Sequence, residues 1–343
     1  MTTARPARSP AELFAAASGG DRTAKARLLS LIERGGEHAR EVGRLAAPLA
    51  GGAYTIGLTG APGAGKSTLT SALITHLRQQ GEEVAVLAVD PSSPFTGGAI
   101  LGDRVRMQDH ATDPGVFIRS MATRGHLGGL ALATPEAIRL LDALGHRWII
   151  VETVGVGQVE VEVAGKADTT VVVVNPGWGD SVQAAKAGLM EVADIFAINK
   201  ADRPGVDETR RDLQQMLELA ADTSAPSIAG WTVPIVATVA SSGQGVGELW
   251  DAVLQHREHM TASGVLDDRR RFRLGEELRE IVARRLEARA RELCTGARWE
   301  ELTSAVLTRD IDPWSAADEM LDPVLPVSDG SANVTPADSP APR

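Results

Sequence analysis

The segment Gly60-Ala-Pro-Gly-Ala-Gly-Lys-Ser67 constrains the fold of this chain more than any other feature. A short apolar run, Thr55 to Thr59, precedes it, and a segment with leucines at positions 69, 73 and 77 follows it. This is the order of strand, glycine-rich loop and helix. The glycines let the backbone curl so that successive N–H groups point to one place, and the helix adds the positive end of its dipole. The segment therefore predicts a phosphate-binding loop (P-loop) in an α/β fold.

Compact apolar runs alternate with helical segments along the following two hundred or so residues. Uninterrupted apolar runs suit strands covered on both faces, as in a parallel sheet. We expect strands at Thr55 to Thr59, Val84 to Val89, Val116 to Arg119, Trp148 to Val151, Thr170 to Val174, Ile195 to Ile198 and Val233 to Ala237. A closing helix should bury one face formed by Val246, Leu249, Trp250, Val253 and Leu254. The expected fold is a P-loop NTPase with a mainly parallel central sheet flanked by helices.

The residue types of the P-loop indicate how it would hold a nucleotide. Lys66 supplies a point charge for the β- and γ-phosphates, and the Ser67 hydroxyl offers an oxygen to Mg²⁺. The alternative, a glycine-rich turn without a ligand, is disfavoured by the strand before the loop and the helix after it. We expect the nucleotide to be bound by Gly60, Ala61, Pro62, Gly63, Ala64, Gly65, Lys66, Ser67 and Thr68.

A second motif, Asn199-Lys200-Ala201-Asp202, follows the expected strand Ile195 to Ile198 and indicates which base is bound. The Asp202 carboxylate can accept hydrogen bonds from the N1–H and the exocyclic amine of guanine, and adenine offers no such pair. An isolated N-K-x-D can be a polar turn. Downstream of a P-loop it predicts binding of GTP and GDP.

Acidic residues near strand ends are candidates for the metal site. Asp90, Asp103 and Glu152 could each face Mg²⁺ directly or through water, and each could instead be a cap or turn residue. Glu152-Thr-Val-Gly155 also lies where P-loop GTPases have D-x-x-G, with the Gly155 amide placed to meet the γ-phosphate. The loop from Gly177 to Lys186 has two glycines and follows another strand end, so we expect a switch loop there.

The composition limits which binding partners and which cellular compartment suit this chain. The net charge of −10 disfavours nucleic acid and anionic membranes, because the mean field repels phosphate. The single cysteine, Cys294, cannot form an internal disulfide, and no run reaches the roughly 18 apolar residues of a membrane span. We expect a cytoplasmic protein. Three histidines, His110, His126 and His146, lack the spacing of metal ligands.

Four regions are expected along the chain. They are a helical extension over residues 1–53, a P-loop GTPase domain over 54–262, a helical arm over 263–322 and a disordered tail over 323–343. The arm is highly charged but carries a narrow apolar seam. This seam either packs on its own domain or joins two copies of the chain, and both readings stay open. Its members are Leu274, Leu278, Ile281, Val282, Leu286 and Leu293.

Three further runs are long and specific. They are Val89-Asp-Pro-Ser-Ser-Pro-Phe-Thr-Gly-Gly98, Arg119-Ser-Met-Ala-Thr-Arg-Gly-His-Leu-Gly-Gly129 and Glu152-Thr-Val-Gly-Val-Gly-Gln158. With the P-loop, they make the chain resemble the methylmalonyl-CoA mutase-associated GTPases, the MeaB or ArgK family. The resemblance runs from the helices near Arg27 through Ile311-Asp-Pro-Trp-Ser315.

This resemblance implies a Mg²⁺-dependent GTPase, usually a homodimer, that escorts an adenosylcobalamin-dependent acyl-CoA mutase of the methylmalonyl-CoA mutase type. GTP binding and hydrolysis would gate cofactor delivery and protect the mutase, and we expect no direct binding of cobalamin. It implies Asp90, Asp103 and Glu152 as the acids that bind Mg²⁺ and position water, with Asp180 and Lys186 acting in partner-stimulated hydrolysis. Val239 and Ala240 would lie at the base, with the Ala240 N–H reaching guanine O6.

The sequence departs from the family pattern at three positions. Trp178 stands where a small residue is usual, Ala187 where a second lysine is common, and Val239 where a serine often stands. Three rival functions remain at this point. They are a metallochaperone GTPase for nickel or cobalt enzymes, a kinase of a transport protein, and a binding module that holds nucleotide without turnover.

Overall fold

A computed structural model describes residues 8–90, 108–110, 112–122, 129–153, 166–177, 189, 191–222 and 230–321. The chain divides into two compact units, Met1–Glu276 and Glu277–Arg343. The first contains the sheet and is described below. The tail expected to be disordered lies outside the described residues, and the four expected regions stay a prediction.

The described part of the first unit contains a seven-stranded sheet with the order β3-β2-β4-β1-β5-β6-β7, in which every neighbouring pair is parallel. All the strands expected from the sequence are present. Their bounds are β1 Tyr54–Gly60, β2 Val84–Asp90, β3 Val116–Ala122, β4 Trp148–Thr153, β5 Thr169–Val174, β6 Ile195–Asn199 and β7 Ile235–Thr238. Strand β7 begins after Pro234 because proline has no N–H to donate to the ladder.

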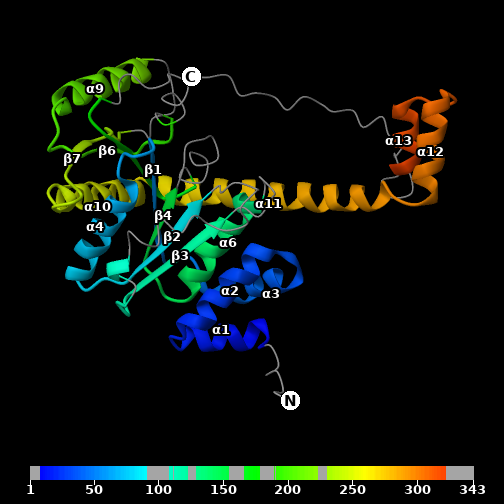
Figure 1. Cartoon of the computed structure of the whole chain (residues 1–343), viewed down its shortest axis with the longest axis horizontal. Helices are drawn as coiled ribbons and strands as arrows, with labels where there is room; N and C mark the ends of the chain where they lie inside the picture. Colours follow the sequence, from blue (N-terminus) through cyan, green and yellow to red (C-terminus); the bar gives the residue numbers. More distant parts are fainter. Residues whose placement is uncertain are drawn as a thin grey trace. The chain divides into compact units, whose positions relative to one another are not determined.

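Helices cover both faces of this sheet (Figure 1). Among the described residues before position 263, the helices are α1 Pro10–Ser18, α2 Arg22–Arg34, α3 Gly36–Ala46, α4 Lys66–Gln79, α6 Gly129–Ala143, α9 Val206–Asp222 and α10 Val246–Ala262. Val84 and Val86 of β2 face α4 and α10, whereas Ala85 and Leu87 face α6 and the helices α1 to α3. Helix α9 packs over β5 and β6. The prediction of a sheet buried on both faces is confirmed.

The buried face of helix α10 matches the expected one at every position but one. Val246, Leu249, Trp250 and Val253 are buried as expected, but Leu254 is 37% exposed. The inclusion of Leu254 in the buried face is therefore wrong. Each residue advances about 100° around a helix, so a residue eight positions after the first member lies at the rim of the apolar stripe.

The charged helix expected near the C-terminus is α11, Val265–Leu293, which spans 29 residues and is followed by α12, Ala297–Thr308, and α13, Pro313–Leu321. Helix α11 is long enough for a bilayer, but acidic and basic residues recur along its whole length. None of the helices within the described ranges combines the length and the apolar character that crossing a membrane requires.

A buried amine and imidazole meet where the N-terminal helices pack on the sheet. The Lys25 Nζ of α2 lies 2.6 Å from the Nε2 of His146 and 5.1 Å from the ring centroid of Phe117. Burial, followed by the charges of Lys25 and Arg22, lowers the pKa of His146 from 6.5 to about 4. Burial also lowers the pKa of Lys25. His146 is therefore neutral in the folded protein near neutral pH.

This contact predicts a loss of stability in mild acid. Between about pH 6.5 and about pH 4 the unfolded chain binds a proton at His146 while the folded chain does not, so the free energy of unfolding falls as the pH is lowered. The full difference is roughly 3 kcal/mol. Urea titrations at about pH 7 and about pH 4.5 should show a larger acid loss for the wild type than for His146→Gln. Equal losses would contradict this assignment.

Candidate functional site

The glycine-rich loop after β1 has the conformation that its sequence predicts. Gly60, Gly63 and Gly65 have φ values of 136°, 71° and 94°, a region that side chains rarely adopt. A Cβ on Gly60 would lie 2.0 Å from the carbonyl oxygen of Val173 in β5, and a Cβ on Gly65 would lie 2.4 Å from the Asn199 Nδ2. Glycine is therefore required at both positions, for the backbone angle and for the close approach of a neighbour.

Helix α4 begins directly at this loop, and its first amide groups face the loop. Gly65 is the N-cap and is left-handed, and no side chain caps this end of the helix. The first N–H groups of a helix have no partner within the helix, so an uncapped end is suited to an anion. The loop and helix together can hold a phosphate group.

Lys66, the first residue of α4, brings a positive charge to the same place. Its side chain is buried, and its Nζ donates to the carbonyl oxygens of Gly60 at 2.7 Å and Ala61 at 3.2 Å. These contacts hold the ammonium group along the loop. A compact ammonium can turn from carbonyl oxygens to phosphate oxygens without a large backbone change.

A serine and a glutamate from different elements meet beside Lys66. The Ser67 Oγ of α4 donates to the Glu152 Oε1 of β4 at 2.5 Å, and Glu152 is fully buried. Strands β1 and β4 are neighbours, with Leu58 opposite Glu152. Thr153 fixes the end of β4 by donating to the Leu58 carbonyl at 3.2 Å. Hydroxyl and carboxylate oxygens are ligands that Mg²⁺ accepts, so this pair fits a magnesium site.

Of the other two acidic candidates for the metal site, only Asp90 lies within the described residues. Asp90 is the last residue of β2, whose Ala88 lies opposite Glu152, so Asp90 ends at the same edge of the sheet. Asp103, Gly155, Asp180 and Lys186 lie outside the described residues. Their roles stay predictions.

The N-K-x-D segment is joined directly to the P-loop. The Asn199 Nδ2 donates to the Ala64 carbonyl at 2.8 Å, and its Oδ1 accepts from the Ala240 N–H at 3.1 Å and from the Thr238 Oγ1 at 3.3 Å. One amide side chain thereby holds three loops together: the P-loop, the loop after β6 and the loop after β7. Thr238 was not expected from the sequence, although it ends the strand directly before Val239 and Ala240, the residues expected at the base.

Lys200 lies over the P-loop in an unusual backbone conformation. Its φ is 58°, and its Nζ donates to the Gly63 carbonyl at 2.5 Å. A left-handed non-glycine residue costs about 1–3 kcal/mol and persists where its surroundings require it. Two residues later, Asp202 is exposed, so its carboxylate is accessible to a ligand.

Val239 and Ala240 follow β7 next to this segment. The Val239 N–H donates to the Gln244 carbonyl at 2.9 Å, and Ala240 is buried beside Asn199. In the structure the Ala240 N–H donates to Asn199. The predicted contact with guanine O6 would require this amide to be shared between two acceptors or released, and it stays a prediction.

The described histidines of the sequence analysis have contacts outside this site. His110 Nε2 lies 3.0 Å from the Ser71 Oγ, and His146 contacts Lys25. Within the described ranges, no three side chains of His, Cys, Asp or Glu gather as a metal site would require.

Comparisons with known proteins agree with this geometry. A family model described as methylmalonyl-CoA mutase-associated GTPase MeaB matches residues 25–294. A putative GTPase of Pyrococcus abyssi is 52% identical over 314 residues, covering 92% of this chain and 96% of that protein. The GTPase ArgK of Escherichia coli is 42% identical over 234 residues, covering 68% and 70%. The crystal structure of a LAO/AO transport system kinase aligns with a TM-score of 0.66 and 28% identity, covering 91% and 96%.

Proposed function

Because the chain belongs to the methylmalonyl-CoA mutase-associated GTPases of the MeaB family, we propose that its GTPase activity controls cofactor loading of a cobalamin-dependent acyl-CoA mutase. The chain would act as a chaperone that admits intact adenosylcobalamin and protects the loaded mutase. The family description names methylmalonyl-CoA mutase as the associated enzyme. We expect the cobalamin to stay on the mutase and not to bind this chain.

The observation that carries the nucleotide part of the proposal is the bridge made by Asn199 between the P-loop and the loop after β7. It brings the loop that we expect to hold phosphates next to the segment that we expect to read the base, which supports one shared nucleotide site. Gly60 to Thr68 would hold the phosphates, and Asp202 would accept two hydrogen bonds from guanine. Ser67 and Glu152 would hold Mg²⁺, with Asp90 and Asp103 as further candidates. Bound Mg²⁺ would neutralise charge on the β- and γ-phosphates.

The sequence supports a role for the switch loop in partner-stimulated hydrolysis. We propose that the Gly155 amide senses the γ-phosphate and that Asp180 and Lys186 act when the mutase binds. Lys186 would stabilise charge that develops in the transition state, as an arginine finger does in other GTPases. Hydrolysis by the chain alone should then be slow.

The mutase part is tested with a purified cobalamin-dependent acyl-CoA mutase. We expect the mutase to accelerate GTP hydrolysis and this chain with GTP to slow inactivation of the mutase during turnover. A mutase that changes neither rate would overturn the chaperone role. A tight stoichiometric nickel complex would favour the metallochaperone alternative, and labelling of a protein by γ-labelled GTP would favour the kinase alternative.

We also propose that two copies of the chain associate through α11. Its apolar side chains are exposed in the single chain, with Leu274 57%, Leu278 62%, Val282 48% and Leu286 57% exposed. The four-residue spacing places them on one side of the helix. Burial against a second copy would remove this apolar surface from water.

The single, exposed Cys294 suits a reducing compartment, and we propose the cytoplasm.

Charge introduced into this seam should separate the copies. Each buried leucine contributes about 1.5–3 kcal/mol, and a glutamate there would be buried without a partner, so Leu278→Glu with Leu286→Glu should give a monomer in sedimentation equilibrium. Arg291→Glu, a charge change at an exposed position on the opposite side of the same helix, serves as the control. A wild-type monomer at high concentration would contradict association through α11.

A further inference from the structure

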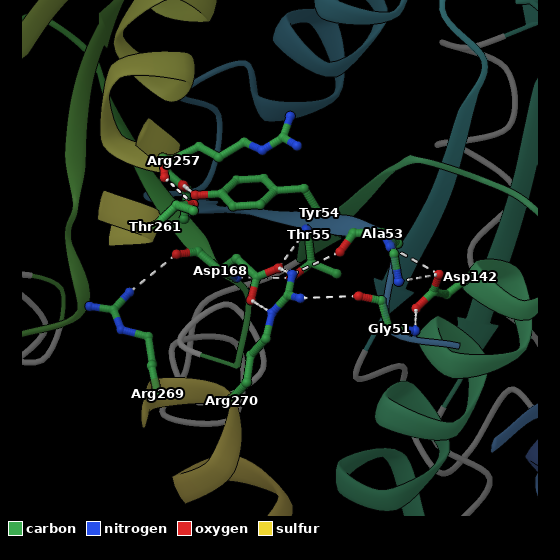
Figure 2. A network of polar contacts seen from close by, with 12 residues as sticks. Gly51, Ala53, Tyr54, Thr55, Asp142, Asp168, Arg257, Thr261, Arg269 and Arg270 are labelled. Carbon is green, nitrogen blue, oxygen red and sulfur yellow. Dashed lines mark hydrogen bonds and ion pairs between the residues drawn. The ribbon is translucent and has the colours of Figure 1, made fainter. Parts of the chain in front are cut away.

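Three arginines near the start of α11 bind two buried aspartates at the edge of the sheet opposite the nucleotide site. They are Arg269, Arg270 and Arg273, and their partners are Asp168 and Asp194. Each aspartate directly precedes a strand, β5 or β6. Figure 2 shows Arg269 reaching the backbone carbonyl of Asp168, and Arg270 lying between the Asp168 carboxylate and the residues just before β1. We refer to these five residues as the arginine clamp.

Asp168 joins α11 to the beginning of β1. Its Oδ2 accepts from the Thr55 N–H at 3.0 Å and from the Arg270 Nη2 at 2.6 Å, while its Oδ1 accepts from the Arg270 Nε at 3.1 Å. Arg273 donates to the same carboxylate. Arg270 also donates to the Ala53 carbonyl at 2.8 Å, directly before β1. The carboxylate is 2% exposed, so these contacts are shielded from water.

Asp194 joins α11 to β5 and to α10. It accepts from both terminal nitrogens of Arg269, each at 3.1 Å, and from the Thr170 N–H of β5 at 2.8 Å. His256 of α10 lies 3.4 Å from the same carboxylate. Arg269 further donates to the backbone carbonyl of Asp168 at 3.2 Å, which links the two halves of the clamp.

The clamp is strongly held because its charges are paired and hydrogen-bonded. Burial alone would raise the pKa of Asp168 and of Asp194, but the hydrogen bonds and charges of the arginines, with His256 for Asp194, outweigh it and lower both. Both aspartates are thus charged near neutral pH. Removing one partner of such a pair typically costs about 3–5 kcal/mol, because the other charge stays buried.

The strands that the clamp joins are the strands that carry the nucleotide site. Strand β1 leads into the P-loop, β5 leads toward Gly177 before the proposed switch loop, and β6 ends at Asn199. The seven residues of β1 span about 23 Å, at a rise of roughly 3.3 Å per residue. Helix α11 is therefore bound to one end of three adjacent strands, and the nucleotide site lies at their other end.

We propose that the arginine clamp couples the nucleotide site to α11, so that bound nucleotide changes the stability of the first turns of α11. The proposal rests on the proposed nucleotide site. A nucleotide stabilises the conformations that bind it, and elements joined by buried charged contacts open together as one cooperative unit. By reciprocity, a partner that binds α11 changes the affinity for nucleotide by the same factor.

Hydrogen exchange of the full-length chain tests this coupling. Backbone amides of residues 265–276 are followed without nucleotide and with saturating GDP and Mg²⁺, and binding is measured separately by calorimetry. We expect GDP to slow exchange of these amides at least about fivefold, the lower end of usual coupling. If GDP binds but exchange in this segment does not change, the coupling is wrong and the nucleotide site stands. If GDP does not bind, the proposed site itself fails.

The variant Arg270→Lys distinguishes coupling through the arginine clamp from a general loss of stability. Lysine keeps the positive charge, so Asp168 stays paired, but it cannot reproduce the forked contact with Asp168 and Ala53. We expect GDP affinity and basal hydrolysis to stay near the wild-type values, while the slowing of exchange falls below about twofold. Arg271→Gln is the control, because Arg271 is exposed and pairs with Asp268 on the surface. Full slowing in Arg270→Lys, or its loss in Arg271→Gln, would overturn the proposal.

Discussion

Replacement of Lys66 by methionine should lower kcat/KM for GTP by about 10²- to 10³-fold without unfolding the protein. The ammonium group lies along the P-loop, bound to the carbonyls of Gly60 and Ala61, at the place where phosphate charge would develop. Methionine keeps most of the length and the apolar character of the lysine stem but removes the charge. Steady-state phosphate release measures the effect, and thermal unfolding checks the fold.

Lys66→Arg is the matched variant for this experiment. It keeps the positive charge, but the planar guanidinium needs more room than the two carbonyl contacts leave. We therefore expect a loss of similar size. Full activity in Lys66→Met would show that this side chain does not act on the phosphates. Activity in Lys66→Arg alone would show that charge is sufficient and that the fit of the ammonium is not important.

Replacement of Asp202 by asparagine should weaken GDP binding at least about 100-fold, because it removes the charged acceptor of two hydrogen bonds worth roughly 1.5–3 kcal/mol each. The asparagine amide would also direct a donor at the exocyclic amine of guanine. Xanthine has a carbonyl at that position, so the variant should gain affinity for xanthosine diphosphate. Competition titrations with both nucleotides measure the change in base choice.

Asp207→Asn provides the control for this change. Asp207 is also exposed and lies in the first turn of α9, five positions after Asp202. Its replacement removes the same charge from the same surface without touching the base motif, so GDP affinity should stay within about twofold of wild type. If both variants weaken GDP equally, the effect is one of net charge and Asp202 does not read the base.

Local sequence signals were sufficient to predict the sheet and the P-loop. The strands are uninterrupted apolar runs, and the glycines at positions 60, 63 and 65 have the backbone angles that the loop requires. The leucines at positions 69, 73 and 77 are all buried on α4, as their spacing predicts. These features depend on neighbours in sequence, and the MeaB resemblance is confirmed by the family model.

Contacts between distant segments could not be predicted in the same way. Asn199 was expected near the base, but its bridge to Ala64 and Ala240 depends on how three loops are placed by β1, β6 and β7. The arginine clamp was missed because its members lie about 75 to 100 residues apart in sequence. An aspartate directly before an apolar strand, as at Asp168 and Asp194, was the available signal. Runs of charged residues are usually exposed to solvent, so the sequence around Arg269 and Arg270 did not indicate buried ion pairs.

Calorimetry of the wild-type chain tests the central claim most directly. GDP and ADP are titrated separately into pure protein with Mg²⁺ and again with a metal chelator. The account predicts one GDP per chain, at least about 100-fold weaker binding of ADP, because guanine alone offers the paired donors to Asp202, and a clear loss of GDP affinity without Mg²⁺. Equal affinity for the two nucleotides, or no heat with GDP, would contradict it.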